Sequence, residues 1–213
     1  MNGLSLILAA ILGYLLGSFP AAYLMVRWKA RVDVRNVGSG NVGTLNSYEV
    51  TRSRLVGTSV LLIDLAKGVL AVVLAGVLLP SAGFEGKAVA GIAAVVGHNF
   101  PLWLGFRGGR GLAPAAGVAL VLQWMIVAAW GAGWGAGFLL TRRVNPGNAI
   151  ASLIVLLLVF FLPDFTIAAL LPDGATIDEF KVFVVVLLTV ILIKHIEPIN
   201  QFIAEKRRKV NSG

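Results

Sequence analysis

Long stretches without a charged residue are the feature that most constrains the fold of this chain. Residues 3–26 and 112–140 carry no charge over 24 and 29 residues. Further, largely apolar runs cover residues 56–79, 88–104, 149–162 and 180–193. About 20 apolar residues suffice for a helix to cross a bilayer, and a helix pairs its backbone polar groups internally, as hydrocarbon requires. The sequence therefore predicts an all-α integral membrane protein.

Composition narrows the chemistry that such a protein can carry. Hydrophobic residues make up 58% of the 213 residues and charged residues 13%, against about 25% charged in soluble domains. The chain has no cysteine, which excludes disulfides, thiolate metal ligands and cysteine nucleophiles. Its two histidines are too few for a convincing metal cluster, so we expect neither a metal nor an organic cofactor. The net charge of +8 sits in short segments between apolar runs, which favours anionic head groups or phosphates over nucleic acid.

The placement of the basic residues predicts the topology. Arginine and lysine follow the first apolar run and do not precede it, which disfavours a signal peptide and places the N-terminus outside. Residues 112–140 are too long for one straight span at about 1.5 Å per residue, so two short tilted helices fit better. Glycines within residues 131–137 allow a break or close helix packing. We expect one compact domain over residues 1–213, a bundle of about seven transmembrane helices with a cytoplasmic C-terminus.

Residues 97–113, GHNFPLWLGFRGGRGLA, form a basic glycine-rich loop between two apolar runs. Successive N–H groups at a glycine turn, followed by a helix N-terminus, make a concavity for an anion, and arginine adds forked donors that suit phosphate oxygens. The alternative is a positive loop that only orients the protein in the membrane. The candidate phosphate-binding residues of this loop are His98, Gly108, Gly109, Arg110 and Gly111.

A second glycine-rich segment lies in the polar stretch at residues 33–46. Small neutral donors suit a phosphate or a carbonyl oxygen, although a flexible surface loop has a similar composition. The presence of two such loops favours a site. Its candidate residues are Arg35, Gly38, Ser39, Gly40, Asn41, Gly43 and Asn46.

Asp64 and Lys67 lie three residues apart within the apolar run at residues 56–79. That spacing places them on one face of a helix, where they can pair. Charges within a span are costly and normally face protein or a water-filled cavity. The two residues form either a buried structural pair or the polar floor of an active site.

Taken together, these segments resemble the acyl-phosphate-dependent glycerol-3-phosphate acyltransferases of bacteria, the PlsY family. The resemblance covers nearly the whole chain in order, and its motifs are GSFP at 17–20, DVR then GSGNVG at 33–43, DxxKG at 64–68, the loop at 97–113, and TRxV at 141–144 with His195. A series of spaced matches is specific, whereas one glycine triplet alone is weak.

The resemblance implies an enzyme of phospholipid biosynthesis in the bacterial inner membrane. It would move an acyl group from acyl phosphate to the 1-hydroxyl of sn-glycerol 3-phosphate, giving lysophosphatidic acid and phosphate at the cytoplasmic face. Arg35 and Arg110 would bind phosphate, while Ser39 and Asn41 would orient substrate. His195 would bind the acceptor or take its proton, unless it is a helix-end residue that snorkels to the interface or substrate phosphate is the base.

Several positions depart from the family pattern. In the first loop, Thr44 and Leu45 make the motif read TLN in place of ATN, and Glu49 stands where an arginine is expected. Further along the chain, Arg110 stands where lysine is usual, Asn145 where serine is expected, and Pro198 where asparagine is expected. Asn145 remains a candidate substrate contact, and Arg52 or Arg54 could replace the missing arginine. The alternatives are a family member with another acceptor or no activity, and a transporter or flippase of an anionic lipid or phosphate compound.

Overall fold

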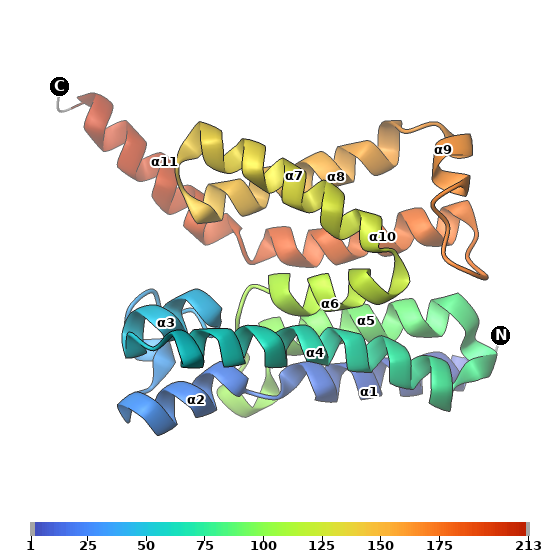
Figure 1. Ribbon diagram of the computed structural model, residues 1–213, viewed down its shortest axis with the longest axis horizontal. Helices are drawn as coiled ribbons and strands as arrows, with labels where there is room; N and C mark the ends of the chain where they lie inside the picture. The colour runs from blue at the N-terminus through green and yellow to red at the C-terminus, as the bar shows by residue number, and fades with distance from the viewer. Residues whose placement is uncertain (1–2, 212–213) are drawn as a thin grey trace.

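A computed structural model describes residues 3–211, with side chains as far as Arg208, and within that part every regular element is helical (Figure 1). The α-helices are α1 Gly3–Ser18, α2 Ala21–Ala30, α3 Thr44–Thr51, α4 Arg54–Leu78, α5 Gly83–Asn99, α6 Leu112–Leu122, α7 Trp124–Thr141, α8 Val144–Phe161, α9 Asp164–Ala168, α10 Ile177–Ile193 and α11 Ile196–Asn211. Short 3-10 turns lie at Val34–Asn36, Pro80–Ala82 and Leu102–Leu104. Each predicted apolar run forms at least one helix, whereas α3, α9 and α11 were not predicted.

The first apolar run is divided at Phe19 and Pro20, between α1 and α2. Proline has no N–H and cannot continue the helical hydrogen-bond ladder, which is why the GSFP motif interrupts the run. Beyond the break α2 continues in much the same direction as α1, and Gly3–Ala30 together is one candidate membrane span (Figure 1).

The 29-residue uncharged stretch is also divided, but at Gln123 and not at the glycines of residues 131–137. Gln123 has an extended backbone (φ −160°, ψ 94°), and its side chain accepts from the N–H of Met125 and donates to the carbonyl of Leu170. The glycines lie inside α7, where Gly133 and Gly137 bring it against α8. They therefore serve close packing, the second of the two roles considered for them.

Four helical segments of the described chain are long and apolar enough to cross a membrane, and a fifth if α10 and α11 count as one span bent by 52°. The four are Gly3–Ala30, α4, α7 and α8. Helix α6, at 11 residues, is a shorter apolar helix. The count of seven transmembrane helices and the orientation of the termini stay predictions.

The helices pack in two groups that share one core (Figure 1). In one group α1 packs on α5 and α4 on α6; in the other α7 packs on α8, which also contacts α10 and α11. A Cβ on Gly68 of α4 would lie 2.0 Å from the carbonyl oxygen of Pro114 in α6, so these two backbones touch. Buried Val95 and Val118 of the first group belong to the same core cluster as Phe183 and Leu187 of α10. This packing fixes where α6 begins relative to α4.

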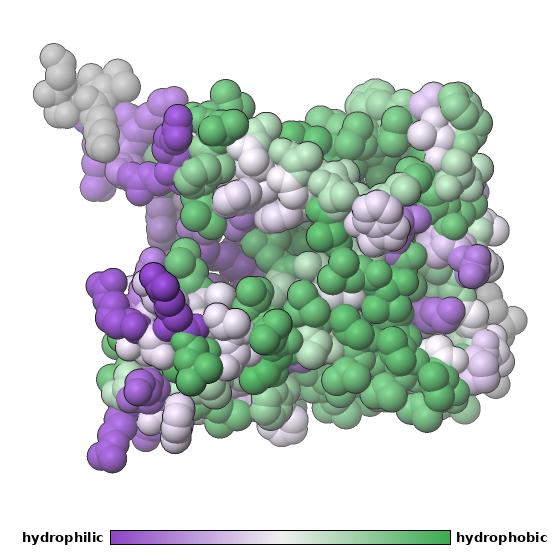
Figure 2. Space-filling model, viewed as in Figure 1, coloured by the Kyte–Doolittle hydropathy of each residue, from purple (hydrophilic) through white to green (hydrophobic). Residues whose placement is uncertain are grey.

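Hydrophilic and hydrophobic residues separate along the axis of the bundle. Figure 2 shows hydrophilic residues gathered at the end where α3 and α11 lie, with a hydrophobic surface over the middle. Large apolar side chains are exposed on several helices, among them Val77, Leu140 and Phe161, which are 69%, 80% and 80% exposed. A surface of this kind suits lipid contact.

Candidate active site

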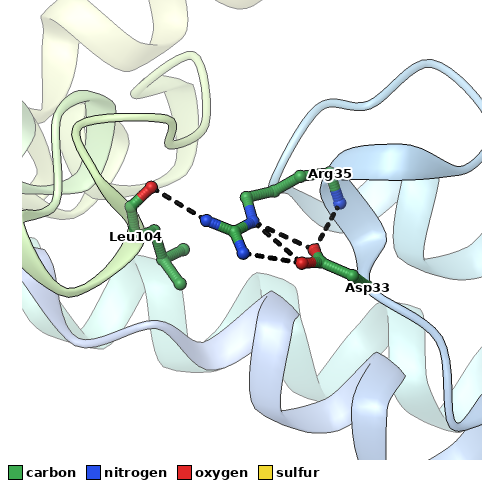
Figure 3. Close-up of polar contacts among 3 residues, drawn as sticks. All are labelled: Asp33, Arg35 and Leu104. Carbon is green, nitrogen blue, oxygen red and sulfur yellow. Dashed lines mark hydrogen bonds and ion pairs between the residues drawn. The ribbon is translucent and has the colours of Figure 1, made fainter.

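The first loop is held by a clamp between Asp33 and Arg35 (Figure 3). The guanidinium Nη2 of Arg35 donates to the Asp33 carboxylate at 2.6 Å, its Nε donates to the same carboxylate, and its Nη1 donates to the carbonyl of Leu104 at 3.0 Å. The hydrogen bonds from Arg35 hold the pKa of Asp33 at about 2, below its ordinary 3.8. Because an arginine has five N–H donors and three are engaged, two remain for a ligand.

Asn46 supports the glycine turn from below. Its side-chain amide donates to three carbonyls, and its oxygen accepts from the N–H of Ser39 at 2.9 Å. The three carbonyls belong to Val34, Val37 and Asn41. Gly38 and Gly40 have φ of 60° and 69°, the left-handed region that glycine adopts at least cost. Asn46 is 1% exposed and its donors and acceptor are engaged, so it shapes the loop and does not line a cavity.

The second loop uses two of its glycine N–H groups within the protein. Gly108 donates to the carbonyl of Asn99 and Gly109 to that of His98. A Cβ on Gly109 would lie 2.1 Å from Nε2 of His98, so the loop rests directly on the imidazole. The N–H groups of Gly108 and Gly109, which were expected to bind phosphate, are therefore occupied, and Gly111 stands at the start of α6. In the first loop, the N–H groups of Gly40 and Gly43 likewise donate to backbone carbonyls.

A buried polar cluster lies beneath this loop. Nζ of Lys67 is 2.6 Å from the carboxylate of Asp64, and Nδ1 of His98 is 3.6 Å from the same carboxylate. The side chains of Asp64 and Lys67 are 2% and 6% exposed. The cluster is thus a buried ion pair that, through His98, also supports the glycine loop. The reading of Asp64 and Lys67 as the floor of an active site stays a prediction.

The two loops enclose a cavity of about 630 Å³, which we call the polar cavity. Its lining includes the sequence-predicted residues Arg35, Gly38, Ser39, Gly40, Asn41, Gly108, Arg110 and Asn145. It also includes Phe106, Arg107, Lys194, Glu197, Pro198 and Gln201, which sequence reasoning did not select as site residues. Lys194 could have been found in the sequence because it directly precedes the motif residue His195. Its ammonium lies 4.8 Å from the centre of the Phe100 ring.

A second cavity of about 580 Å³, the mixed cavity, adjoins the polar one and shares Asn41, Arg110 and Asn145 with it. Nη1 of Arg110 donates to the side-chain oxygen of Asn145 at 2.6 Å, which places the guanidinium at the border between the two cavities. Burial lowers the pKa of Arg110, but an arginine stays charged in proteins.

The N-termini of α3 and α6 both reach the mixed cavity. Thr44 and Leu45 of α3 line it together with Leu112 and Ala113 of α6, and Gly43 lies at the start of α3. The first N–H groups of a helix have no partner inside it, and the helix dipole favours negative charge there. Two such termini beside Arg110 make a strongly anion-attracting site.

A third cavity of about 240 Å³, the apolar cavity, continues from the mixed one between α6, α7 and α10. The two share Leu112, Ala116 and Trp130. The indole N–H of Trp130 donates to the hydroxyl of Ser152 at 3.1 Å, which fixes the ring at their border. The three cavities therefore pass from cationic to apolar surroundings in one direction.

His195 lies behind these cavities and does not line them. It is fully buried, its Nδ1 is 2.9 Å from the carbonyl of Ile191, and its Nε2 is 3.4 Å from the side-chain amide of Asn148. A carbonyl only accepts, so Nδ1 carries the proton and Nε2 accepts from Asn148. Asn148 itself lines the mixed cavity. Snorkelling to the interface is excluded by this burial.

Some of the residues that depart from the family pattern line the cavities, and others do not. Glu49, Arg52 and Arg54 are exposed and none of them lines the polar or the mixed cavity. The structure therefore gives no support to a replacement of the expected arginine by Arg52 or Arg54. Asn145 and Pro198 do line the polar cavity.

Comparison with known proteins identifies the family. The family model described as glycerol-3-phosphate acyltransferase matches residues 7–205. A glycerol-3-phosphate acyltransferase of Mesorhizobium japonicum is 35% identical over 97% of both chains, and one of Synechococcus elongatus is 39% identical over 76% of this chain and 79% of its own. The crystal structure of PlsY, an integral membrane glycerol 3-phosphate acyltransferase, in its glycerol 3-phosphate form has a TM-score of 0.76 at 28% identity, covering 94% of this chain and 93% of that one.

The lysophosphatidic acid form of PlsY gives a TM-score of 0.74 at 26% identity. The PlsY neighbour and the long apolar helices together make this a multi-pass membrane protein. The chain belongs to the glycerol-3-phosphate acyltransferase family.

Proposed function

We propose that this protein transfers an acyl group from acyl phosphate to the 1-hydroxyl of sn-glycerol 3-phosphate, at the cytoplasmic face of a bacterial inner membrane, as a step of phospholipid synthesis. One observation carries the proposal: the polar, mixed and apolar cavities adjoin in that order and share residues at each border. Both substrates carry a phosphate, and one also carries an acyl chain. A cavity series that is cationic at one end and apolar at the other suits both.

The phosphate groups belong at the cationic end. Arg107, Arg110 and Lys194 line the polar cavity. Glu197 also lines it, so the cations outnumber the acids among its lining residues. Arg35 contributes less charge because the Asp33 carboxylate already neutralises it. Charge-assisted hydrogen bonds from arginine to phosphate are about twice as strong as neutral ones, and arginine binds in a forked geometry.

The acyl chain belongs in the mixed and apolar cavities. Leu112, Ala116 and Trp130 join the two, and the far wall is made by Leu187, Leu188 and Ile191 of α10. With the chain there, its carbonyl lies near Arg110 and the N-termini of α3 and α6. Donors placed where negative charge develops on a carbonyl oxygen commonly supply the largest part of the rate enhancement.

The transfer needs one proton to move. The acceptor oxygen bonds to the carbonyl carbon, the bond from that carbon to the phosphate oxygen breaks, and phosphate leaves. Nε2 of His195 accepts from Asn148 and does not face a cavity, so it is poorly placed to take the hydroxyl proton. We therefore assign the proton to a substrate phosphate oxygen, and to His195 the positioning of Asn148.

A family member with another acceptor is the second candidate, and the position of Glu49 favours it. Neither Arg52 nor Arg54 lines the polar or the mixed cavity, which leaves Arg107, Arg110 and Lys194 as the cations available to the acceptor's anion. A longer or differently placed anionic group than that of glycerol 3-phosphate would fit the same cations.

The test supplies the purified protein in detergent with palmitoyl phosphate and, in separate reactions, glycerol 3-phosphate, glycerol and dihydroxyacetone phosphate. We expect lysophosphatidic acid and stoichiometric phosphate with glycerol 3-phosphate, and little product with glycerol. Preference for dihydroxyacetone phosphate would favour the second candidate. If acyl phosphate is not consumed with any of the three acceptors, acyl transfer is refuted, and transport of an anionic lipid or phosphate compound is the function that remains.

A further inference from the structure

A further cavity lies at the opposite end of the bundle from the active site. Its volume is about 560 Å³, and it opens between the C-terminal part of α4, the start of α5, the break between α6 and α7, and the segment at residues 171–173 (Figure 1). It shares no lining residue with the polar, mixed or apolar cavity. We call it the distal groove.

Two opposite charges line the distal groove without a partner. Lys87 of α5 and Asp173 both line it, and within the described part of the chain neither side chain makes a hydrogen bond or a salt bridge. The stem of Lys87 crosses α4 at Gly76, where a Cβ would lie 3.1 Å from the lysine Cε. The absence of a side chain at position 76 thus lets the lysine lie across α4. The groove offers a cation and an anion to one occupant.

The other lining residues are mostly apolar, apart from Gln123, whose side-chain amide donates to the carbonyl of Leu170, and several of them are open to the surroundings. Val77 is 69% exposed, Trp124 58%, Leu120 46% and Val73 42%, and all four line it. In a membrane-spanning protein these side chains face hydrocarbon, and tryptophan is typical of the level of the head groups. The occupant must therefore carry both polar charges and apolar chains.

We propose that the distal groove binds a zwitterionic diacyl phospholipid of the leaflet opposite the active site. The lipid phosphate pairs with Lys87, its ammonium group pairs with Asp173, and its acyl chains lie along Val73, Val77 and Leu120. Charge complementarity selects this occupant. A free phosphate or an anionic lipid would leave the Asp173 carboxylate beside a like charge, and a neutral lipid would leave both charges unpaired.

The walls of the groove come from both helix groups. Val72 and Phe84 stand on the side of α4 and α5, while Trp124 and Leu171 stand on the side of α7 and the segment before α10. A lipid held between them binds only the folded arrangement and so stabilises it by mass action. Binding should therefore raise the thermal unfolding midpoint, independently of acyl transfer at the other end.

The experiment measures retention of added lipid by native mass spectrometry and the unfolding midpoint of the purified protein in detergent. The probes are phosphatidylethanolamine, phosphatidylglycerol of the same acyl chains, glycerophosphoethanolamine and inorganic phosphate. We expect saturable binding of one phosphatidylethanolamine with a raised midpoint, and at least tenfold weaker binding of the other three probes. Equal binding of phosphatidylglycerol would overturn the zwitterionic assignment, and equal effects of glycerophosphoethanolamine or phosphate would overturn the lipid.

Matched variants separate the groove from general lipid contact. Lys87→Gln and Asp173→Asn should each weaken phosphatidylethanolamine binding roughly tenfold, the loss expected for one charge-assisted contact. Lys29→Gln and Asp178→Asn remove the same charges from exposed positions outside the groove and should leave binding unchanged. The unfolding midpoint without lipid confirms that each variant is folded. Unchanged binding in both groove variants, or equal losses in the controls, would overturn the proposal.

Discussion

Replacing Asp64 with asparagine tests whether the buried pair supports the active site. The Asp64→Asn variant keeps the size of the side chain but leaves the ammonium of Lys67 without its counter-charge, 2.6 Å away, in a place where the lysine side chain is 6% exposed. An uncompensated charge in such surroundings is strongly destabilising, because neither water nor a partner solvates it.

Breaking a buried ion pair costs about 3–5 kcal/mol. In a chain of this size each kcal/mol lowers the unfolding midpoint by about 2–4 °C, so we expect a fall of roughly 6–20 °C. The pair of Lys181 with Asp164 is a matched control, because its distance is 2.7 Å but its side chains are 30% and 69% exposed. Exposed pairs contribute about 0–1 kcal/mol, so Asp164→Asn should lower the midpoint by at most about 4 °C.

The assay follows tryptophan fluorescence during thermal unfolding in one detergent at one heating rate. A double variant, Asp64→Asn with Lys67→Met, removes both charges and should recover at least half of the loss. A midpoint for Asp64→Asn no lower than that of the exposed control would refute the reasoning. So would a double variant whose loss equals the sum of the two single losses.

The remaining predictions concern the loops, the buried histidine and the topology. Arg110→Ala should lower kcat/KM by roughly tenfold to more than a hundredfold, because it removes a charge-assisted contact of about 1.5–3 kcal/mol. Arg110→Lys should keep most of the activity, and normal kinetics in both variants would remove Arg110 from the site. His195→Ala should lower kcat by a factor on the order of 10² with little change in KM. In His195→Gln the amide oxygen can accept the hydrogen bond from Asn148, so part of the lost kcat should return, and no such rescue would argue against a positioning role. The pKa of Asp33 is lowered from 3.8 to about 2, so its clamp stabilises the fold above about pH 4 and this contribution is lost as the pH falls toward 2; the midpoint of Asp33→Asn should change less over that range than that of the unmodified protein. A cysteine introduced at Arg143 should resist an impermeant thiol reagent in intact cells, and labelling there would refute the predicted topology.

The sequence was informative about the helices because hydrophobic length is a local property. The division of residues 112–140 followed from comparing their length with a bilayer, but its position at Gln123 did not. That break depends on a side-chain amide that reaches the carbonyl of Leu170, 47 residues away. A contact between distant segments leaves no periodic signal in the sequence.

The candidate site was predictable to the extent that it lies on glycine-rich loops. Ser39, Asn41 and Arg110 line the cavities as residues of the two loops that the composition selected. Asn46 was also predicted to bind substrate but lines neither cavity, because its side chain binds the loop itself. The sequence cannot tell an amide that binds a ligand from one that binds its own loop. Likewise, the burial of His195 results from the packing of α8 beside α10 and is invisible in a local motif.

The cations that matter most for the proposed acceptor come from the part of the chain where local patterns are weakest. Lys194 lies at the bend of 52° between α10 and α11, and that bend brings Glu197 and Gln201 of α11 over the first loop. Arg35 is already neutralised by its clamp, so the uncompensated charge of the polar cavity lies toward the second loop and the bend. A cation lost at position 49 can therefore be replaced in space by residues more than fifty positions away in sequence. The acceptor's anion should follow that charge, which makes Lys194, and not the neighbours of Glu49, the residue whose neutralisation raises the acceptor KM most.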